Sequence, residues 1–266
     1  MNAVSIKNLS KVYERRVWLG KNTRKEVLKN VSLEIPQGRV VGLVGESGCG
    51  KTTLCKVVLG IEPPTSGSVA VNGVNISGLS KAGWKKLRRH LQVVYQDPYS
   101  SLDPRMRVRE IVGEPLDIHG LKKGRAERET FLKELLASVG LEPDALSRYP
   151  HEFSGGQRQR IAIARALAVD PKVLIADEPV SALDVSVQAQ ILNLLKDIVR
   201  ARGLTMLFVT HDFAVARFLC DDIAVMQGGE IAEFAPAEEI FTHPRHEYTQ
   251  KLLAAVPSVS RRNLYA

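Results

Sequence analysis

The sequence has few cysteines and no long hydrophobic segment. Its three cysteines, Cys49, Cys55 and Cys220, are scattered and odd in number, so they do not form a disulfide framework, and a reducing compartment is expected. The longest apolar runs are about five to seven residues, far short of the roughly 20 needed to span a bilayer. Residues 1–7 lack the apolar core of a signal peptide. These absences argue against a secreted disulfide scaffold and a membrane-spanning protein, and predict a soluble, cytosolic one.

Length and composition are those of a globular protein. The chain has 266 residues, of which 44% are hydrophobic and 25% are charged, and these proportions exclude wholesale disorder. Neither an internal repeat nor a low-complexity segment is found, so a solenoid is not expected. The length allows one large domain or two modest ones.

Positive charge exceeds negative charge, with 37 Lys and Arg against 29 Asp and Glu and a net charge of +8. The excess is concentrated in residues 1–30 and in a cluster of five basic residues at 81–89. Such an excess is typical of proteins that bind nucleic acid, anionic lipid or a phosphorylated ligand. A solvated basic face explains it equally well from charge alone.

Hydrophobic periodicity predicts strands that alternate with helices. Alternating apolar residues predict strands, and continuous apolar runs predict buried strands. The alternating strands are expected at residues 4–6, 31–35 and 69–71, and the buried ones at 40–44, 173–176 and 205–209. Helical spacing prevails from residue 81 to about 146 and again at 191–198. The pattern indicates a mostly parallel α/β core into which a helical block is inserted.

A phosphate-binding loop follows the predicted strand 40–44. Residues 45–52, Gly-Glu-Ser-Gly-Cys-Gly-Lys-Thr, match G-x-x-x-x-G-K-[ST]. In this pattern glycines let backbone N–H groups turn toward phosphate oxygens, the lysine reaches the β and γ phosphates, and the hydroxyl after it can hold Mg²⁺. The alternative is a glycine-rich turn without a ligand. The residues expected to bind nucleotide here are Gly45, Ser47, Gly48, Cys49, Gly50, Lys51, Thr52 and Thr53.

Two carboxylates end the predicted strand at 173–176. Ligands of doubly wound sheets bind beyond the carboxyl ends of the strands, where Asp177 and Glu178 are expected. Adjacent residues of an extended chain point in opposite directions, so the two acids should have different roles. Asp177 can hold Mg²⁺, and Glu178 can act as a general base on an attacking water. A solvated strand end is the alternative for this pair alone.

A helix start at Ser154 carries a capping box. Ser154 and Gln157 fit S-x-x-Q, in which each side chain bonds the backbone N–H of the other residue. Gly155 and Gly156 beside the cap leave the first helical N–H groups bare, so the helix start can receive an anion.

Taken together, these motifs resemble those of the ATP-binding cassette (ABC) ATPases, the nucleotide-binding subunits of ABC transporters, over nearly the whole chain. Residues 153–157, Phe-Ser-Gly-Gly-Gln, are similar to the family's signature motif, with Phe where Leu is more usual. Gln96 resembles the Q-loop glutamine, residues 181–184 the D-loop, and His211 the switch histidine. Tyr13 is the best candidate for the aromatic that stacks on adenine, and Trp18 is the alternative.

The resemblance implies a fold and a division of the chain. The implied fold is an α/β P-loop NTPase core with a mostly parallel sheet, an N-terminal antiparallel β subdomain and an inserted α-helical subdomain. The chain would be one ABC ATPase domain: residues 1–95 and 155–235 form the catalytic core, about 96–154 the helical subdomain with the signature motif at its end, and 236–266 a C-terminal extension.

The resemblance also implies a mechanism that needs two cassettes. Each ATP lies between one chain's phosphate loop and the signature helix of a second, identical or paralogous ATPase subunit in a head-to-tail dimer. The residues expected at the signature side of the nucleotide are Ser154, Gly155, Gly156, Gln157 and Asp184. Those expected to act in hydrolysis are Glu178, His211, Gln96 and Lys51, with Mg²⁺ held by Thr52, Gln96 and Asp177.

Four further segments resemble the oligopeptide, dipeptide and nickel importer ATPases: residues 46–50, 97–105, 184–190 and 243–257. This likeness implies a peripheral subunit on the cytoplasmic face of the inner membrane. It also implies two transmembrane permease subunits, docked in a groove lined by residues 96–109, and an extracytoplasmic substrate-binding protein as an indirect partner. Peptides and nickel both remain open as cargo.

A soluble ABC-type ATPase acting on nucleic acid is the competing function. Such ATPases separate the phosphate loop from the signature motif with a long coiled coil. The 103 residues between Lys51 and Ser154 contain no sustained heptads, so no nucleic-acid partner is expected.

Overall fold

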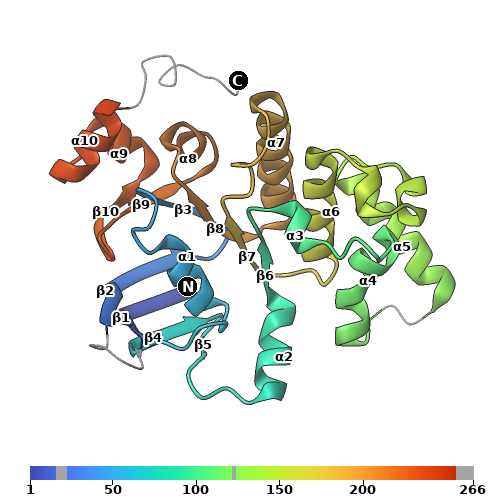
Figure 1. The fold of residues 1–266 in the computed structure, drawn as a ribbon, viewed down its shortest axis with the longest axis horizontal. Helices are drawn as coiled ribbons and strands as arrows, with labels where there is room; N and C mark the ends of the chain where they lie inside the picture. The colour runs from blue at the N-terminus through green and yellow to red at the C-terminus, as the bar shows by residue number, and fades with distance from the viewer. Residues whose placement is uncertain (16–22, 122–123, 256–266) are drawn as a thin grey trace. The chain divides into compact units, whose positions relative to one another are not determined.

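The computed structural model describes residues 1–15, 23–121 and 124–255 of the chain. It divides into two compact units (Figure 1). The first comprises residues 1–80 and 205–266, and the second comprises residues 81–204. Among the described residues no helix combines the length and the apolar character that a bilayer crossing requires.

The first unit contains an antiparallel sheet with the strand order β2-β1-β4-β5 (Figure 1). Its strands are β1 (Asn2–Arg15), β2 (Thr23–Pro36), β4 (Ser66–Val71) and β5 (Val74–Asn75). Alternate residues such as Val4 and Ile6 are buried, as period-2 patterning requires. Asn72 and Gly73 both have positive φ, 48° and 76°, which is the geometry of a tight hairpin turn.

The first unit also holds the strands β10-β9-β3-β8, in that spatial order. They are β3 (Val40–Val44), β8 (Thr205–Thr210), β9 (Asp222–Gln227) and β10 (Glu230–Pro236). β3 runs parallel to β8 and β9, and β9 pairs antiparallel with β10. Every residue of β3 is buried, which explains its continuous apolar run. The helices of this unit are α1 (Lys51–Val58), α8 (Phe213–Leu219), α9 (Ala237–Thr242) and α10 (Glu247–Ala255).

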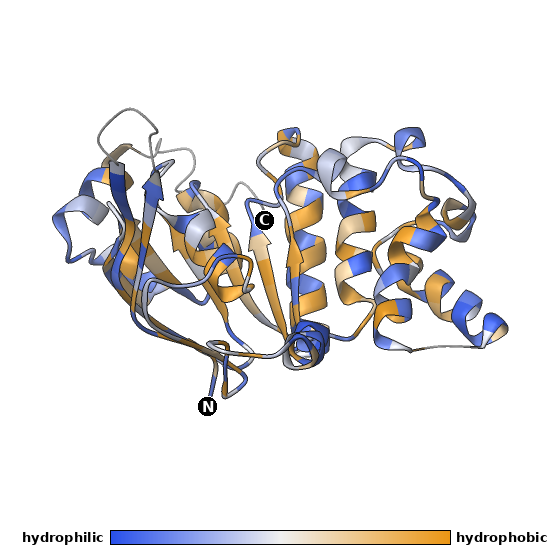
Figure 2. Ribbon diagram, turned by 60° about the horizontal axis from the view of Figure 1, so that its bottom comes forward, coloured by the Kyte–Doolittle hydropathy of each residue, from blue (hydrophilic) through white to orange (hydrophobic). Residues whose placement is uncertain are grey.

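The second unit combines two parallel strands with helices, and it contains the segment 96–154. β6 (Leu91–Val94) pairs with β7 (Val173–Asp177). The helices are α2 (Lys81–His90), α3 (Pro98–Ser101), α4 (Val108–His119), α5 (Arg125–Ser138), η1 (Pro143–Ser147), η2 (Pro150–Glu152), α6 (Gly155–Leu167) and α7 (Val185–Arg202). Figure 2 shows the central strands largely in the hydrophobic colour, whereas the helices carry both colours, as amphipathic helices do.

All six strands predicted from the sequence are present within β1, β2, β3, β4, β7 and β8, so these predictions are confirmed. The segment predicted as mainly helical, residue 81 to about 146, also contains β6, which the periodicity did not reveal. A run of only four residues carries too little pattern to separate strand from helix. Its strand state depends on hydrogen bonds to β7, which lies about 80 residues away in sequence.

Candidate nucleotide-binding site

The phosphate loop lies between β3 and α1 in the first unit. Gly48 and Gly50 have φ of 80° and 117°, values that favour glycine because a Cβ would be strained there. The Lys51 side chain is almost fully buried, and its ammonium donates hydrogen bonds to the carbonyl oxygens of Gly45 (2.7 Å) and Glu46 (2.9 Å). The loop therefore has the backbone turns that its motif predicts, with the lysine held along its inner side.

Backbone and side chains of neighbouring strands surround the loop closely. A Cβ at Gly45 would overlap the carbonyl oxygen of Met226 in β9. A Cβ at Gly50 would lie 2.8 Å from Cε of Met226 and 3.0 Å from Cδ2 of Leu28 in β2. Neither position has room for a Cβ, so both must be glycine. The loop is therefore packed closely against β2 and β9.

None of the three cysteines, all within the described residues, forms a disulfide, and all three are buried. Burial raises the pKa of the Cys49 thiol, and the positive charge of Lys51 opposes this shift without cancelling it. Burial likewise raises the pKa of Cys220. Since the thiolate is the reactive form, a loop cysteine with a raised pKa should be chemically inert.

We therefore expect the native protein to react slowly with a thiol reagent such as DTNB at pH 7.5. After unfolding in urea all three thiols should react rapidly. Peptide mapping after brief labelling of the native protein checks the assignment. Fast, stoichiometric modification of Cys49 in the folded chain would contradict the expected inertness.

His211 and the phosphate loop lie at the same edge of the strands of the first unit. β3 and β8 run in parallel with Val44 paired to Thr210, so Gly45 and His211 follow the carboxyl ends of neighbouring strands. The His211 side chain is exposed. Asp212 caps α8 by accepting the N–H of Ala214 at 2.7 Å, which fixes the chain direction just after the histidine.

Tyr13 lies on β1, two residues beyond Lys11, whose pairing partner is Leu28 of β2. Leu28 also approaches Gly50 of the phosphate loop, whereas Tyr13 itself lies opposite Lys25 of β2. Its ring is 37% exposed, and the Lys11 ammonium lies 4.8 Å from the ring centroid. Trp18, the alternative stacking residue, lies outside the described residues.

In the second unit, Gln96 and the two carboxylates follow neighbouring strands. β6 and β7 are parallel with Val94 paired to Ala176, which places Gln96 and Asp177 at the same strand edge. Asp177 is 8% exposed, whereas Gln96 is exposed. Glu178 has φ of 48°, a left-handed conformation that is uncommon outside glycine and is concentrated at functional sites.

The capping box predicted at the start of α6 is confirmed. The Ser154 hydroxyl accepts the N–H of Gln157 at 3.3 Å, and the Gln157 side-chain oxygen accepts the N–H of Ser154 at 3.0 Å. A Cβ at Gly156 would overlap Cγ1 of Val187 in α7. A Cβ at Gly155 would lie 3.3 Å from Leu183. The signature-like glycines are thus packed against the residues that flank Asp184, the N-cap of α7.

Two buried polar residues near the site were not singled out from the sequence. Gln159 of α6 is completely buried, and its side-chain amide donates to the carbonyl of Tyr95, next to Gln96, at 3.4 Å. Tyr248 of α10 is buried in the first unit. A polar residue inside an apolar helical run was the available signal for Gln159, and Tyr248 gave none because its partners are distant in sequence.

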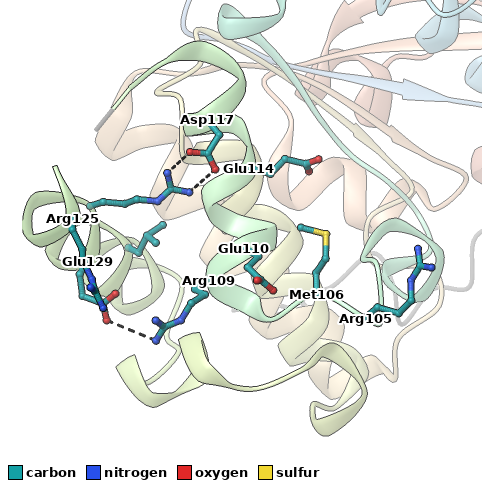
Figure 3. Close-up of a pocket in the computed structure, with 10 residues that line it drawn as sticks. Arg105, Met106, Arg109, Glu110, Glu114, Asp117, Arg125 and Glu129 are labelled. Carbon is teal, nitrogen blue, oxygen red and sulfur yellow. Dashed lines mark hydrogen bonds and ion pairs between the residues drawn. The ribbon is translucent and has the colours of Figure 1, made fainter. Parts of the chain in front are cut away.

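A pocket of about 530 Å³ lies in the second unit, between residues of α4 and α5 (Figure 3). Its lining is strongly charged and of mixed sign: Arg105, Met106, Arg109, Glu110, Glu114, Asp117, Arg125, Arg128, Glu129 and Leu132. Three of these, Arg105, Met106 and Arg109, fall within the segment 96–109 that was expected to line a groove for permease subunits.

Ion pairs hold part of the pocket wall. The Arg128 guanidinium bonds both carboxylate oxygens of Asp117 and the carbonyl of Gly113, and the hydrogen bonds from Arg128 lower the pKa of Asp117. Figure 3 shows Arg109 reaching across to Glu129, 4.0 Å away. The wall can therefore offer both positive and negative groups to a partner.

These features define a class of protein. A glycine-rich loop between a buried parallel strand and a helix, with a lysine folded along it, is the architecture of P-loop nucleotide-binding proteins. In the second unit, a parallel strand ends in two carboxylates, and a helix begins with a capped, glycine-rich turn.

Comparison with known proteins makes the class specific. The ABC transporter family matches residues 28–181, and the C-terminal region of oligopeptide/dipeptide transporters matches residues 232–265. The chain belongs to the ABC transporter family, as its ATP-binding subunit.

Similar proteins include the oligopeptide transport ATP-binding protein OppF of Streptococcus mutans, 48% identical over 96% of this chain and 81% of that protein. OppF of Bacillus subtilis is 49% identical over 87% of this chain and 76% of that protein. The dipeptide transport ATP-binding protein DppF of Lactococcus lactis is 48% identical over 96% of this chain and 81% of that protein.

Solved structures agree with the family assignment. The ATP-binding cassette MJ0796, a dimer bound to ADP and Pi after hydrolysis, has a TM-score of 0.77 and 34% identity over 88% of this chain and 98% of that chain. CbiO1 of Clostridium perfringens has a TM-score of 0.77 and 27% identity over 98% of both chains. The predicted ABC ATPase fold is confirmed, and the chain is an ATPase subunit.

Proposed function

We propose that this chain hydrolyses ATP to power an importer of peptides. The observation that carries the proposal is the 48% identity to OppF and DppF over 96% of the chain, which extends through the C-terminal region shared by oligopeptide and dipeptide transporters. Nickel, the other cargo considered, has no counterpart among these relatives. The comparisons give no support to action on nucleic acid.

Lys51 and the loop that it closes bind the phosphates of ATP. The ammonium now held by the carbonyls of Gly45 and Glu46 is within side-chain reach of a phosphate placed over the N–H groups of the loop. When phosphate oxygens replace the two neutral carbonyl acceptors, the hydrogen bonds of the ammonium become stronger, because donor and acceptor are then both charged. Thr52 and Thr53 follow at the start of α1, where the helix dipole favours an anion.

Glu178 serves as the general base for the attacking water. Its backbone is held in the left-handed conformation by hydrogen bonds from Ser181, whose N–H and hydroxyl both donate to the Glu178 carbonyl at 3.2 and 3.1 Å. The turn directs the Glu178 side chain differently from that of Asp177 in the strand. His211 orients the water and the γ-phosphate, and Gln96 senses them through its amide.

The donors assigned to the metal fit Mg²⁺. Thr52, Asp177 and Gln96 supply oxygen atoms, the ligand type that Mg²⁺ prefers, and this ion is usually bound through one or two protein groups with water and substrate phosphate completing its shell. Bound Mg²⁺ neutralises charge on the phosphates. The protein supplies these oxygens from the Thr52 hydroxyl beside the loop and from the buried Asp177 carboxylate.

A second cassette completes each ATP site. One chain carries one phosphate loop and one signature motif, and the similar cassette MJ0796 is a dimer. The contact surface offered by this chain includes Ser154, Gly155, Gly156 and Gln157 at the start of α6, with Asp184 beside them. The partner ATPase is identical or paralogous, related by a real or pseudo two-fold axis.

The charged pocket of α4 and α5 receives permease subunits at the cytoplasmic face of the membrane. A mixed-sign lining suits a short polar helix better than an apolar one, since each of its charges can find a partner. Charge reversal by Arg109→Glu should therefore reduce co-purification of the permeases by roughly tenfold, the effect of a lost partly buried ion pair. Lys7→Glu, an equal charge change at an exposed residue of β1, is the control.

The test isolates the tagged chain from its own membranes in mild detergent and identifies what accompanies it. Two integral membrane subunits and a second cassette are expected, and the complex in proteoliposomes should take up labelled peptides when ATP is supplied. Uptake of Ni²⁺ but not of peptides would overturn the cargo. Retention on DNA at moderate salt without membrane subunits would overturn the transporter assignment.

A further inference from the structure

The helix α6, which begins with the signature-like motif, carries a buried glutamine. Gln159 is completely buried, as are Ile161 and Ile163 of the same helix. Its side-chain N–H donates to the carbonyl of Tyr95 at 3.4 Å, whereas its amide oxygen has no hydrogen-bond partner among the residues that the structure describes. The amide of Gln159 therefore reaches the backbone directly before Gln96.

Packing alone does not explain an amide at this position. Moving an amide from water into an apolar interior costs free energy unless new hydrogen bonds replace the lost ones. Here the N–H makes one long bond, and within the described chain the oxygen makes none. A methionine of similar length would fill the same space without that cost, so what the amide adds is its contact with the Tyr95 carbonyl.

The chain after Gln96 is attached to the same helix. The Arg165 guanidinium donates to the carbonyl of Ser101 at 2.5 Å, and the guanidinium carbon of Arg158 lies 4.0 Å from the centroid of the Tyr99 ring. Tyr99 and Ser101 belong to α3, which packs against α6 (Figure 1). Gln96 therefore lies between two attachments to α6, one at the residue before it and one at α3.

We propose that Gln159 is a positioning residue for Gln96: its amide holds the Tyr95 carbonyl, and the orientation of the Tyr95–Gln96 peptide in turn directs the Gln96 side chain. The inference rests on the proposed function, in which Gln96 senses the water and the γ-phosphate. The Gln96 side chain is exposed, so its direction depends on the backbone that carries it. The same bond ties Gln96 to the helix that begins with the signature-like motif, so a displacement of one is passed to the other.

Gln159→Met in the full chain removes the amide and keeps the approximate size of the side chain. Turnover at saturating MgATP should fall about three- to tenfold, the range that corresponds to the net effect of one hydrogen bond. The KM for MgATP should change by less than about twofold, because the contacts of the phosphate loop are retained. The melting temperature should stay the same or rise, because a buried amide oxygen without a partner is removed.

A double-mutant cycle with Gln96→Ala separates positioning from a general loss of structure. If Gln159 acts through Gln96, Gln159→Met should slow hydrolysis in the wild-type background and cause no further loss in Gln96→Ala. Single-turnover measurements allow the slow variants to be compared. A glutamine with a purely structural role would slow hydrolysis by the same factor in both backgrounds, and that result would overturn the proposal, as would wild-type turnover in Gln159→Met.

Gln92→Met is the matched control. The Gln92 amide also donates to a backbone carbonyl, that of Arg88, but Gln92 lies near the start of β6, whereas Gln96 follows its end. Turnover of this variant should equal that of the wild type, and an equal loss in both variants would refute the positioning role while the proposed function stands. Failure of the wild-type protein itself to hydrolyse MgATP would refute the proposed function instead.

Discussion

Glu178→Gln should bind ATP normally, lose hydrolysis by about two to four orders of magnitude, and accumulate as a closed dimer. The magnitude is that of a general base removed from a reaction that retains its other catalytic groups. Glutamine keeps the size and the hydrogen-bonding oxygen of the side chain, so the left-handed turn at φ 48° is not expected to change. In the proposed mechanism hydrolysis ends the closed state, so without it ATP should remain between the two cassettes.

The measurement is turnover at saturating MgATP, together with the oligomeric state by light scattering with and without nucleotide. Glu142→Gln, an equivalent change at an exposed residue of the second unit, is the matched control. Near wild-type turnover in Glu178→Gln would remove this residue from the general-base role. Loss of ATP binding would show instead that the change had damaged the site.

Local motifs predicted the elements whose conformation is decided within a few residues. The phosphate loop, the capping box of Ser154 and Gln157, and the turn at Asn72 and Gly73 each depend on neighbouring backbone groups. The structure shows all three. The buried strands were equally accessible, because a strand covered on both faces reads as an unbroken apolar run.

Contacts between distant segments could not be predicted in the same way. The β9–β10 hairpin is the exception: it is local, its turn contains Gly228 and Gly229, both at positive φ, and a Gly-Gly pair between apolar runs is a hairpin signal that was not used. Gln159 acquires its contact with the Tyr95 carbonyl only when α6 meets the end of β6. One polar residue in a helix has the same local pattern whether it is solvated or buried beside a site.

Apart from Lys51, the basic residues in excess do not belong to the predicted nucleotide site. Five basic residues of α2 are exposed: Lys81, Lys85, Lys86, Arg88 and Arg89. Their charge reaches neighbouring histidines, since burial first and then cations such as Arg89 lower the pKa of both His90 and His119. Burial together with these cations thus favours the neutral form of both histidines, and the positive charge lies on the exposed side chains of α2.

Lys51→Ala should abolish ATP binding at micromolar nucleotide, a loss on the order of 100-fold or more. A hydrogen bond to a charged group contributes about 1.5–3 kcal/mol, and Lys51 is placed to make more than one with the β and γ phosphates. The variant also leaves the Gly45 and Glu46 carbonyls without their donor, so a decrease of about 1–2 kcal/mol in unfolding free energy accompanies it. Lys56→Ala, at an exposed position of the same helix, controls for the loss of charge.

Titration with a fluorescent ATP analogue and a thermal melt separate the two effects: affinity must be lost in a chain that remains folded. Tight binding by folded Lys51→Ala would refute the phosphate-loop assignment, since no other residue of the loop can supply a positive charge.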